Sequence, residues 1–205
     1  KANDMFRYIM AVLLGGQYIT WILWEIITGR FNIHLSLPFN LCDISNILCV
    51  ILLLAKSNKL FEIIYFWAIG GSIQSYITPN LYFGWPHIEF IVFYIQHGGM
   101  ILVILFFAII IKYRPEAISI AKSLCTLLVF IVIVYSFNLI TDSNYMFLMA
   151  DTPHPTTVTK MIQIFGEPPL HMIGLMIVTG LTYTIMYTPY AVMDLVKKMK
   201  KKKAS

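Results

Sequence analysis

Two side chains in the sequence have the chemistry of a nucleophile and of a base, and each stands among polar residues within an apolar stretch. Cys42 lies between Leu41 and Asp43, and His97 follows Gln96 and precedes two glycines. A thiolate attacks carbonyl carbon, and an imidazole exchanges protons near neutral pH. Cys42 and His97 are therefore the candidate catalytic residues. The open alternatives are a small buried hydrophobe for Cys42 and an interhelical hydrogen bond for His97.

Other polar side chains recur near the ends of apolar stretches, where they are predicted to line a substrate-binding site. Strongly polar groups are costly in hydrocarbon, so they usually face a bundle interior or a cavity. The predicted substrate-binding residues are Asn40, Asp43, Gln74, Glu89, Gln96, Asn138 and His171. No cysteine pair has metal-ligand spacing, and His97 has no second histidine four residues away. We therefore expect neither a metal site nor a cofactor.

The elements that carry these residues are predicted to be membrane-spanning helices. Of the 205 residues, 59% are hydrophobic and 12% are charged, whereas a soluble domain averages roughly 45–50% apolar and about 25% charged residues. Lipid must cover this apolar surface, and in lipid a helix satisfies its own backbone groups. The sequence therefore predicts an all-α polytopic membrane helix bundle and no nucleic-acid partner.

Six apolar runs are predicted to be the transmembrane helices, since a crossing needs about 20 residues. They cover residues 5–28, 38–55, 60–78, 88–111, 117–140 and 169–196. Residues 1–205 are thus predicted to form a single transmembrane domain, with a lysine-rich cytoplasmic tail at 197–205. Before the sixth run, Pro155 precedes four apolar residues at helical spacing and Gly166 follows them. This pattern predicts a short amphipathic helix at the membrane surface.

The basic residues predict the orientation of the bundle. Numbering the connections alternately places nearly all lysines and arginines on one side: Lys1, Arg7, Lys56, Lys59, Lys112, Arg114, Lys122 and lysines 197, 198, 200, 201, 202 and 203. Only Arg30 and Lys160 fall on the other side. Positive residues stay in the cytoplasm, so both termini are predicted to be cytoplasmic, with the polar residues in the outer half of the cytoplasmic (plasma) membrane. The tail lysines either bind anionic lipid or act only as a topology signal.

Several segments, taken in order, resemble the bacterial YwaF-like integral membrane family. They are residues 37–43, 65–81, 86–87, 97–99 and 144–146, and the resemblance covers about residues 30 to 175. Asn40 stands where a histidine is expected in that family. The family is distantly similar to eukaryotic transmembrane acyltransferases that remodel ether phospholipids. The resemblance implies acyl transfer through Cys42 and His97.

Three functions are compatible with the sequence. The first is an acyltransferase or lipid hydrolase that forms a thioester on Cys42, with Asn40, Gln74 or Asn138 stabilising the oxyanion. The second is the substrate-capture membrane subunit of a small-molecule importer. The third is a non-enzymatic assembly protein whose polar residues only hold helices together. Membrane lipids are the expected partners, the importer subunit would also need a cytoplasmic energising partner, and the sequence does not identify a protein partner.

Overall fold

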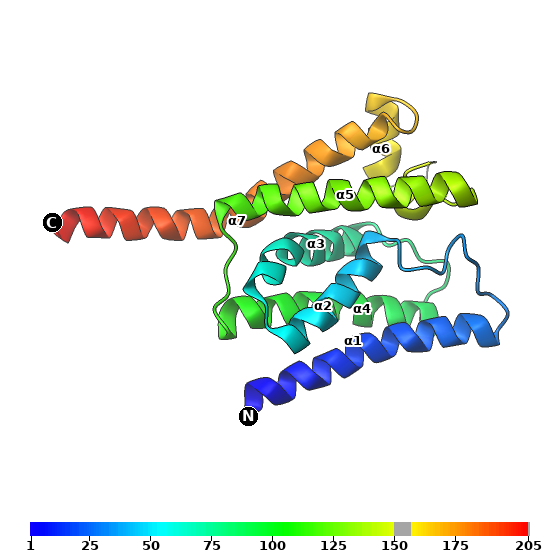
Figure 1. The fold of residues 1–205 in the computed structure, drawn as a ribbon, viewed down its shortest axis with the longest axis horizontal. Helices are drawn as coiled ribbons and strands as arrows, with labels where there is room; N and C mark the ends of the chain where they lie inside the picture. The colour runs from blue at the N-terminus through cyan, green and yellow to red at the C-terminus, as the bar shows by residue number, and fades with distance from the viewer. Residues whose placement is uncertain (150–156, 205) are drawn as a thin grey trace.

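The computed structural model describes residues 1–149 and 157–204, and within these the chain forms seven α-helices and no strand (Figure 1). The helices are α1 (Ala2–Ile27), α2 (Leu41–Ala55), α3 (Asn58–Ile77), α4 (Ile88–Leu105), α5 (Ala117–Thr141), α6 (Thr157–Phe165) and α7 (His171–Ala204). A π-helical turn, Phe106–Ile110, extends α4, and a 3-10 turn, Tyr145–Phe147, follows α5. The predicted all-α bundle is confirmed.

The helices form two groups that meet at α3. Helices α1 to α4 pack on one another, while α5 and α7 pack against α3 and against each other (Figure 1). Helix α6 packs on the start of α7, where a Cβ added to Gly174 would lie 2.7 Å from the sulfur of Met161. This is the predicted short helix, although Pro155 lies outside the described residues. Its position at the membrane surface stays a prediction.

Four of the helices are long and apolar enough to cross a membrane by themselves. These are α1, α4 with its π-helical turn, α5, and α7 as far as Lys200. Helix α2 is apolar but has 15 residues, which is about 22 Å of helix against ~30 Å of hydrocarbon. Helix α3 has 20 residues, enough for the full thickness. It lies between the two groups of helices, and many of its side chains are buried.

Several helix ends differ from the predicted runs by a few residues, and the start of α2 and the end of α7 differ for local reasons. Helix α2 begins at Leu41 instead of Pro38 because Asn40 has extended backbone angles, φ −78° and ψ 148°, and is the N-cap. Helix α7 continues through the lysine tail to Ala204, since lysine favours helix. It changes direction along its length (Figure 1) and contains Pro189, whose ring breaks one helical hydrogen bond.

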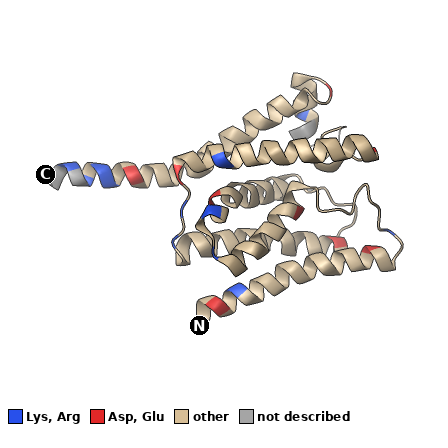
Figure 2. Ribbon diagram, in the orientation of Figure 1, with Lys and Arg blue, Asp and Glu red and all other residues tan. Residues whose placement is uncertain are grey.

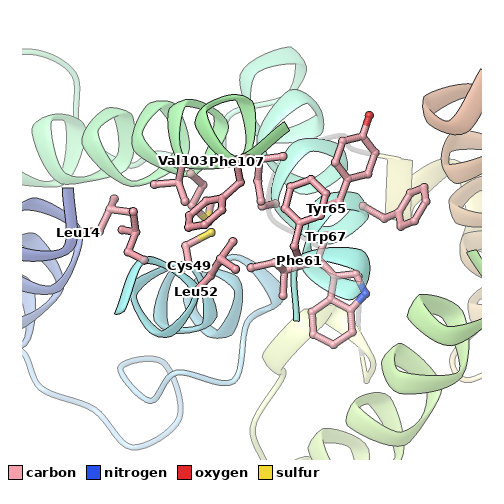
Figure 3. Close-up of a cluster of buried hydrophobic side chains, with 14 of the residues drawn as sticks. Leu14, Cys49, Leu52, Phe61, Tyr65, Trp67, Val103 and Phe107 are labelled. Atoms are coloured by element: carbon pink, nitrogen blue, oxygen red, sulfur yellow. The ribbon is translucent and has the colours of Figure 1, made fainter. Parts of the chain in front are cut away.

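The apolar core lies where α1, α2, α3 and α4 meet (Figure 3). Leu14, Cys49, Leu52, Phe61 and Val103 are fully buried there. Their burial follows from helical spacing, because residues three or four apart share a face. Cys49 is thus surrounded by apolar side chains, in agreement with its interpretation as a small hydrophobe, whereas Cys125 is exposed on α5.

Basic residues gather at the end of the molecule that carries both termini (Figure 2). Three ion pairs join separate elements near this end, Lys56 with Asp4, Lys122 with Glu62, and Arg114 with Asp194, and Arg7 also pairs with Asp4 within α1. Most of these side chains are partly exposed, so each pair contributes little stability alone. Their shared location agrees with the predicted cytoplasmic end of an N-in, C-in bundle.

Candidate functional site

A partly buried hydrogen-bonded group forms around the carboxylate of Asp43, in the first turn of α2. Oδ1 of Asp43 accepts a hydrogen bond of 3.1 Å from Nε2 of Gln96 on α4. Oδ2 accepts one of 3.2 Å from Nδ2 of Asn40, the N-cap residue of the same helix. The structure therefore brings together Asn40, Asp43 and Gln96, and the Asp43 carboxylate links α2 to α4.

The segment after α5 is held by Asn138, which is fully buried in the last turns of that helix. Its Nδ2 donates to the carbonyl of Tyr145 at 3.0 Å, and its Oδ1 accepts from the amide of Tyr145 at 3.1 Å. The hydroxyl of Tyr145 donates to the carbonyl of Ile33 and accepts from the amide of Leu37. Burial raises the pKa of Tyr145, which keeps this hydroxyl protonated as a donor.

Two further predicted site residues bind the same segment. Oδ1 of Asn40 accepts a 3.3 Å hydrogen bond from the amide of Met146. His171, fully buried at the start of α7, donates from Nε2 to the carbonyl of Phe147 at 3.1 Å. Asn40, Asn138 and His171 thus fasten the 3-10 turn over the outer ends of α2, α5 and α7. Each of these three side chains makes at least one hydrogen bond to the backbone of the turn, and their predicted role in substrate binding stays a prediction.

His97 has one nitrogen fixed and the other without a partner. Its side chain is buried, at 4% exposure, and Nδ1 donates to the carbonyl of Phe93 at 2.8 Å. Nε2 is also buried and has no hydrogen-bond partner among the described residues. Because the carbonyl can only accept, a neutral ring places its lone pair on Nε2. The ring of Tyr76 on α3 lies edge-on to it, 6.3 Å between centroids.

Cys42 points to a different helix from its neighbour Asp43. Its sulfur lies 3.7 Å from the hydroxyl oxygen of Ser75 on α3, and a Cβ added to Gly71 would be 3.7 Å from the same sulfur. Adjacent residues on a helix point about 100° apart, so Asp43 faces α4 while Cys42 faces α3. Neither the thiol nor the His97 ring hydrogen-bonds to the other. The predicted Cys42–His97 pair is therefore not joined by a hydrogen bond in this structure, and its catalytic role stays a prediction.

A family model matches residues 1–187 of the chain and is described as the TMEM164 family. The chain belongs to the TMEM164 family. No curated protein and no solved structure gave a match. The family name and the apolar helices together establish that this TMEM164-family chain is a multi-pass membrane protein. The resemblance to YwaF-like proteins and to ether-phospholipid acyltransferases stays a prediction.

Two predicted residues of the TMEM164-family chain lie apart from the Asp43 group. Gln74 is exposed on α3, where its Nε2 donates to the Thr78 hydroxyl at 2.8 Å. Glu89 lies at the start of α4, where Oε1 accepts from the amide of Tyr82 at 3.2 Å. Both side chains bond to residues of the connection between α3 and α4. The structure therefore places them beside the connection between α3 and α4, apart from the Asp43 group.

Gln17 is one of the buried polar residues of the TMEM164-family chain that sequence reasoning missed. Gln17 of α1 is 7% exposed, and neither atom of its amide group has a partner among the described residues. The signal was present in the sequence, because Arg7, Met10 and Leu14 continue to Gln17 at helical spacing and are all buried. A polar residue on the buried stripe of an apolar helix is the pattern that identifies it.

A shallow, open apolar groove lies on the surface between α5 and α7 in the TMEM164-family chain. It is lined by Leu128, Met172, Ile173, Met176 and Ile177. The groove begins one residue from His171, at the outer end of α7. Its lining suits a hydrocarbon chain. Among the described residues, no three His, Cys, Asp or Glu side chains are grouped to hold a metal ion.

Proposed function

We propose that this TMEM164-family protein is a membrane-embedded enzyme that transfers or hydrolyses an acyl chain of a membrane lipid in the outer half of the plasma membrane. The observation that supports the proposal most is His97, because one ring nitrogen is anchored and the other presents an unused lone pair in the membrane interior. This is the arrangement that a general base requires. The resemblance to acyltransferases names the reaction class.

The proposed reaction begins when the Cys42 thiol gives its proton to Nε2 of His97. The thiolate attacks the carbonyl carbon of a lipid ester, a C–S bond forms, and the C–O bond breaks. The departing alkoxide takes the proton from His97 and leaves as a lysolipid. The hydroxyl of an acceptor lipid, or water, then loses its proton to His97 and attacks the thioester carbonyl, so that a C–O bond forms and the C–S bond breaks. The departing Cys42 thiolate takes the proton back from His97, which restores the thiol.

This reaction requires the Cys42 side chain to turn away from Ser75. Catalytic hydrogen bonds are often absent before substrate binds and form only in the complex. Of the amides predicted to stabilise the oxyanion, Asn40 and Asn138 donate to Asp43 and to Tyr145, and Gln74 is exposed. We propose that the acyl chain lies in the apolar groove between α5 and α7, with the headgroup near Asp43 and Glu89. The tail lysines contact anionic lipid in this proposal.

The test is lipid turnover by the purified protein in vesicles that contain a phospholipid with a labelled acyl chain and an unlabelled lysolipid. Mass spectrometry separates labelled fatty acid from acyl chain transferred to the lysolipid. We expect Cys42→Ala to lose turnover and Cys125→Ala to keep it, since Cys125 is exposed on α5. Unchanged turnover in Cys42→Ala would show that the thiol mechanism is wrong.

A structural role is the second candidate, and one observation favours it. The polar side chains near the start of α2 and the end of α5 form hydrogen bonds with one another or with the backbone; they are Asn40, Asp43, Gln96 and Asn138. A network of this kind is explained if its one role is to hold the helices and the turn after α5 in place. In that case substitutions at Asp43 lower stability without removing a separable activity. Turnover per folded molecule distinguishes the two functions.

A further inference from the structure

Buried residues whose polar atoms have no hydrogen-bond partner among the described residues include Arg7, Glu25 and Ser45. Four others lie one on each of α1 to α4. They are Gln17 with both amide atoms, Asn46 with Oδ1, Ser72 with Oγ, and His97 with Nε2. Asn46 and Ser72 are fully buried. In lipid such atoms have no outside partner, and each costs free energy comparable to a lost hydrogen bond.

Contacts between the helices place Gln17 and Asn46 in one layer. Nδ2 of Asn46 donates to the carbonyl of Leu14 at 3.2 Å, and Gln17 lies one helical turn beyond Leu14. Leu14 also covers Gly99 of α4, where an added Cβ would lie 2.6 Å from its Cδ2. His97 lies two residues before Gly99. Gln17 and Asn46 are therefore within about one turn of the same contact, whereas His97 points about 200° away from Gly99 around α4 and faces Tyr76 of α3.

Ser72 joins this layer through α3. It lies one turn before Tyr76, whose ring faces His97, and three residues before Ser75, which contacts Cys42 of α2. Ser72 is thus between the side of α3 that meets α2 and the side that meets α4. Since α2 also packs on α4, the four residues face the interior that these helices share.

The unpartnered atoms include both hydrogen-bond donors and acceptors, and this mixture indicates which ligand could bind them. The amide nitrogen of Gln17 only donates, the oxygens of Gln17 and Asn46 only accept, and the Ser72 hydroxyl does both. A cation would satisfy the oxygens but would meet the amide hydrogens of Gln17. An anion would satisfy those hydrogens but would lie near the carboxylate of Asp43, one turn from Asn46. Water donates and accepts, and buried water commonly makes about three such bonds.

We infer that ordered water molecules occupy the interior between α1, α2, α3 and α4, where they bind Gln17, Asn46, Ser72 and His97. This hydration goes beyond the proposed function, because it holds whether or not the protein is an enzyme. It also places water at Nε2 of His97 without passage through lipid. In this inference the buried polar side chains of α1 to α4 are hydrated, and their polar atoms are not left without hydrogen bonds.

The sign of a stability change tests the inference. In Gln17→Met an apolar side chain of similar length replaces the amide. If water is present, the substitution removes its partners, and we expect Tm of the purified full-length protein to fall by about 2–8 °C. If the interior is empty, the substitution relieves an unpaired amide and Tm rises, which would overturn the inference. Gln163→Met, at an exposed position of α6, is the matched control and should leave Tm nearly unchanged.

Radiolytic hydroxyl-radical labelling gives a second readout that needs no variant, in case Gln17→Met fails to fold. Radicals formed from bound water oxidise adjacent side chains that bulk solvent does not reach. We expect the buried His97 of the wild-type protein to be oxidised, with the exposed His34 as the positive reference. An unlabelled His97 beside a labelled His34 would overturn the inference.

Discussion

At the scale of single residues, buried amides decide whether the turn after α5 closes over the helix ends. Asn138 both donates to and accepts from the backbone of Tyr145. In Asn138→Ala two buried backbone groups lose their partner, so we expect a loss of about 1–3 kcal/mol in unfolding free energy. Thermal or denaturant unfolding in detergent measures this loss.

Ser136→Ala is the control for that substitution. Ser136 lies on the same helix, is exposed, and donates only to the carbonyl of Val132 one turn earlier. We expect its replacement to change the unfolding free energy by less than about 0.5 kcal/mol. Equal effects of the two variants would show that the bonds to Tyr145 do not hold the turn.

The sequence predicted which polar residues lie at the outer ends of the helices, but not which partners they bind. Hydropathy sets the depth of Asn40, Asp43 and Gln96, and the structure brings these three together. Hydropathy does not set the rotation of each helix about its own axis. For that reason the sequence could not show whether the Cys42 and His97 side chains face each other, and it did not reveal that Gln17 is buried.

At the scale of elements, close packing of α1 on α4 depends on Gly99. An added Cβ there would lie 2.6 Å from Cδ2 of Leu14. In Gly99→Val the larger side chain must push the two helices apart or force Leu14 into another rotamer. We expect a loss of about 1–3 kcal/mol in unfolding free energy.

Gly15→Val tests the same change of side chain where there is room for it. An added Cβ at Gly15 of α1 has no heavy atom within 4 Å. We expect unfolding in detergent to show a change of less than about 1 kcal/mol for this variant. A comparable loss in both variants would mean that helix propensity, and not the contact of α1 with α4, determines the effect.

The sequence located the helices well because apolar runs determine them. The observed α4 and α5 begin at residues 88 and 117, as predicted. The start of α2 and the end of α7 differed because they depend on capping and on helix propensity, which apolarity does not report. The packing of α5 and α7 on α3 was also beyond the sequence, since the order of helices along a chain does not fix their neighbours.

At the scale of the whole molecule, the basic end of the bundle predicts its orientation. In a background without Cys42, Cys49 and Cys125, single cysteines replace Gly84, between α3 and α4, and Lys59, in the first turn of α3. A membrane-impermeant thiol reagent applied to intact cells should label Gly84→Cys and leave Lys59→Cys unlabelled until the cells are permeabilised. Labelling of Lys59→Cys alone in intact cells would reverse the proposed orientation.

The central claim is that the free nitrogen of His97 acts as a base in the membrane interior, and lipid turnover by His97→Asn tests it most directly. The asparagine amide can keep the hydrogen bond to the Phe93 carbonyl but cannot accept a proton as imidazole does. We predict that the reconstituted variant unfolds near the wild-type temperature and that its turnover falls about 100-fold or more. Turnover equal to that of the wild-type protein would contradict the claim.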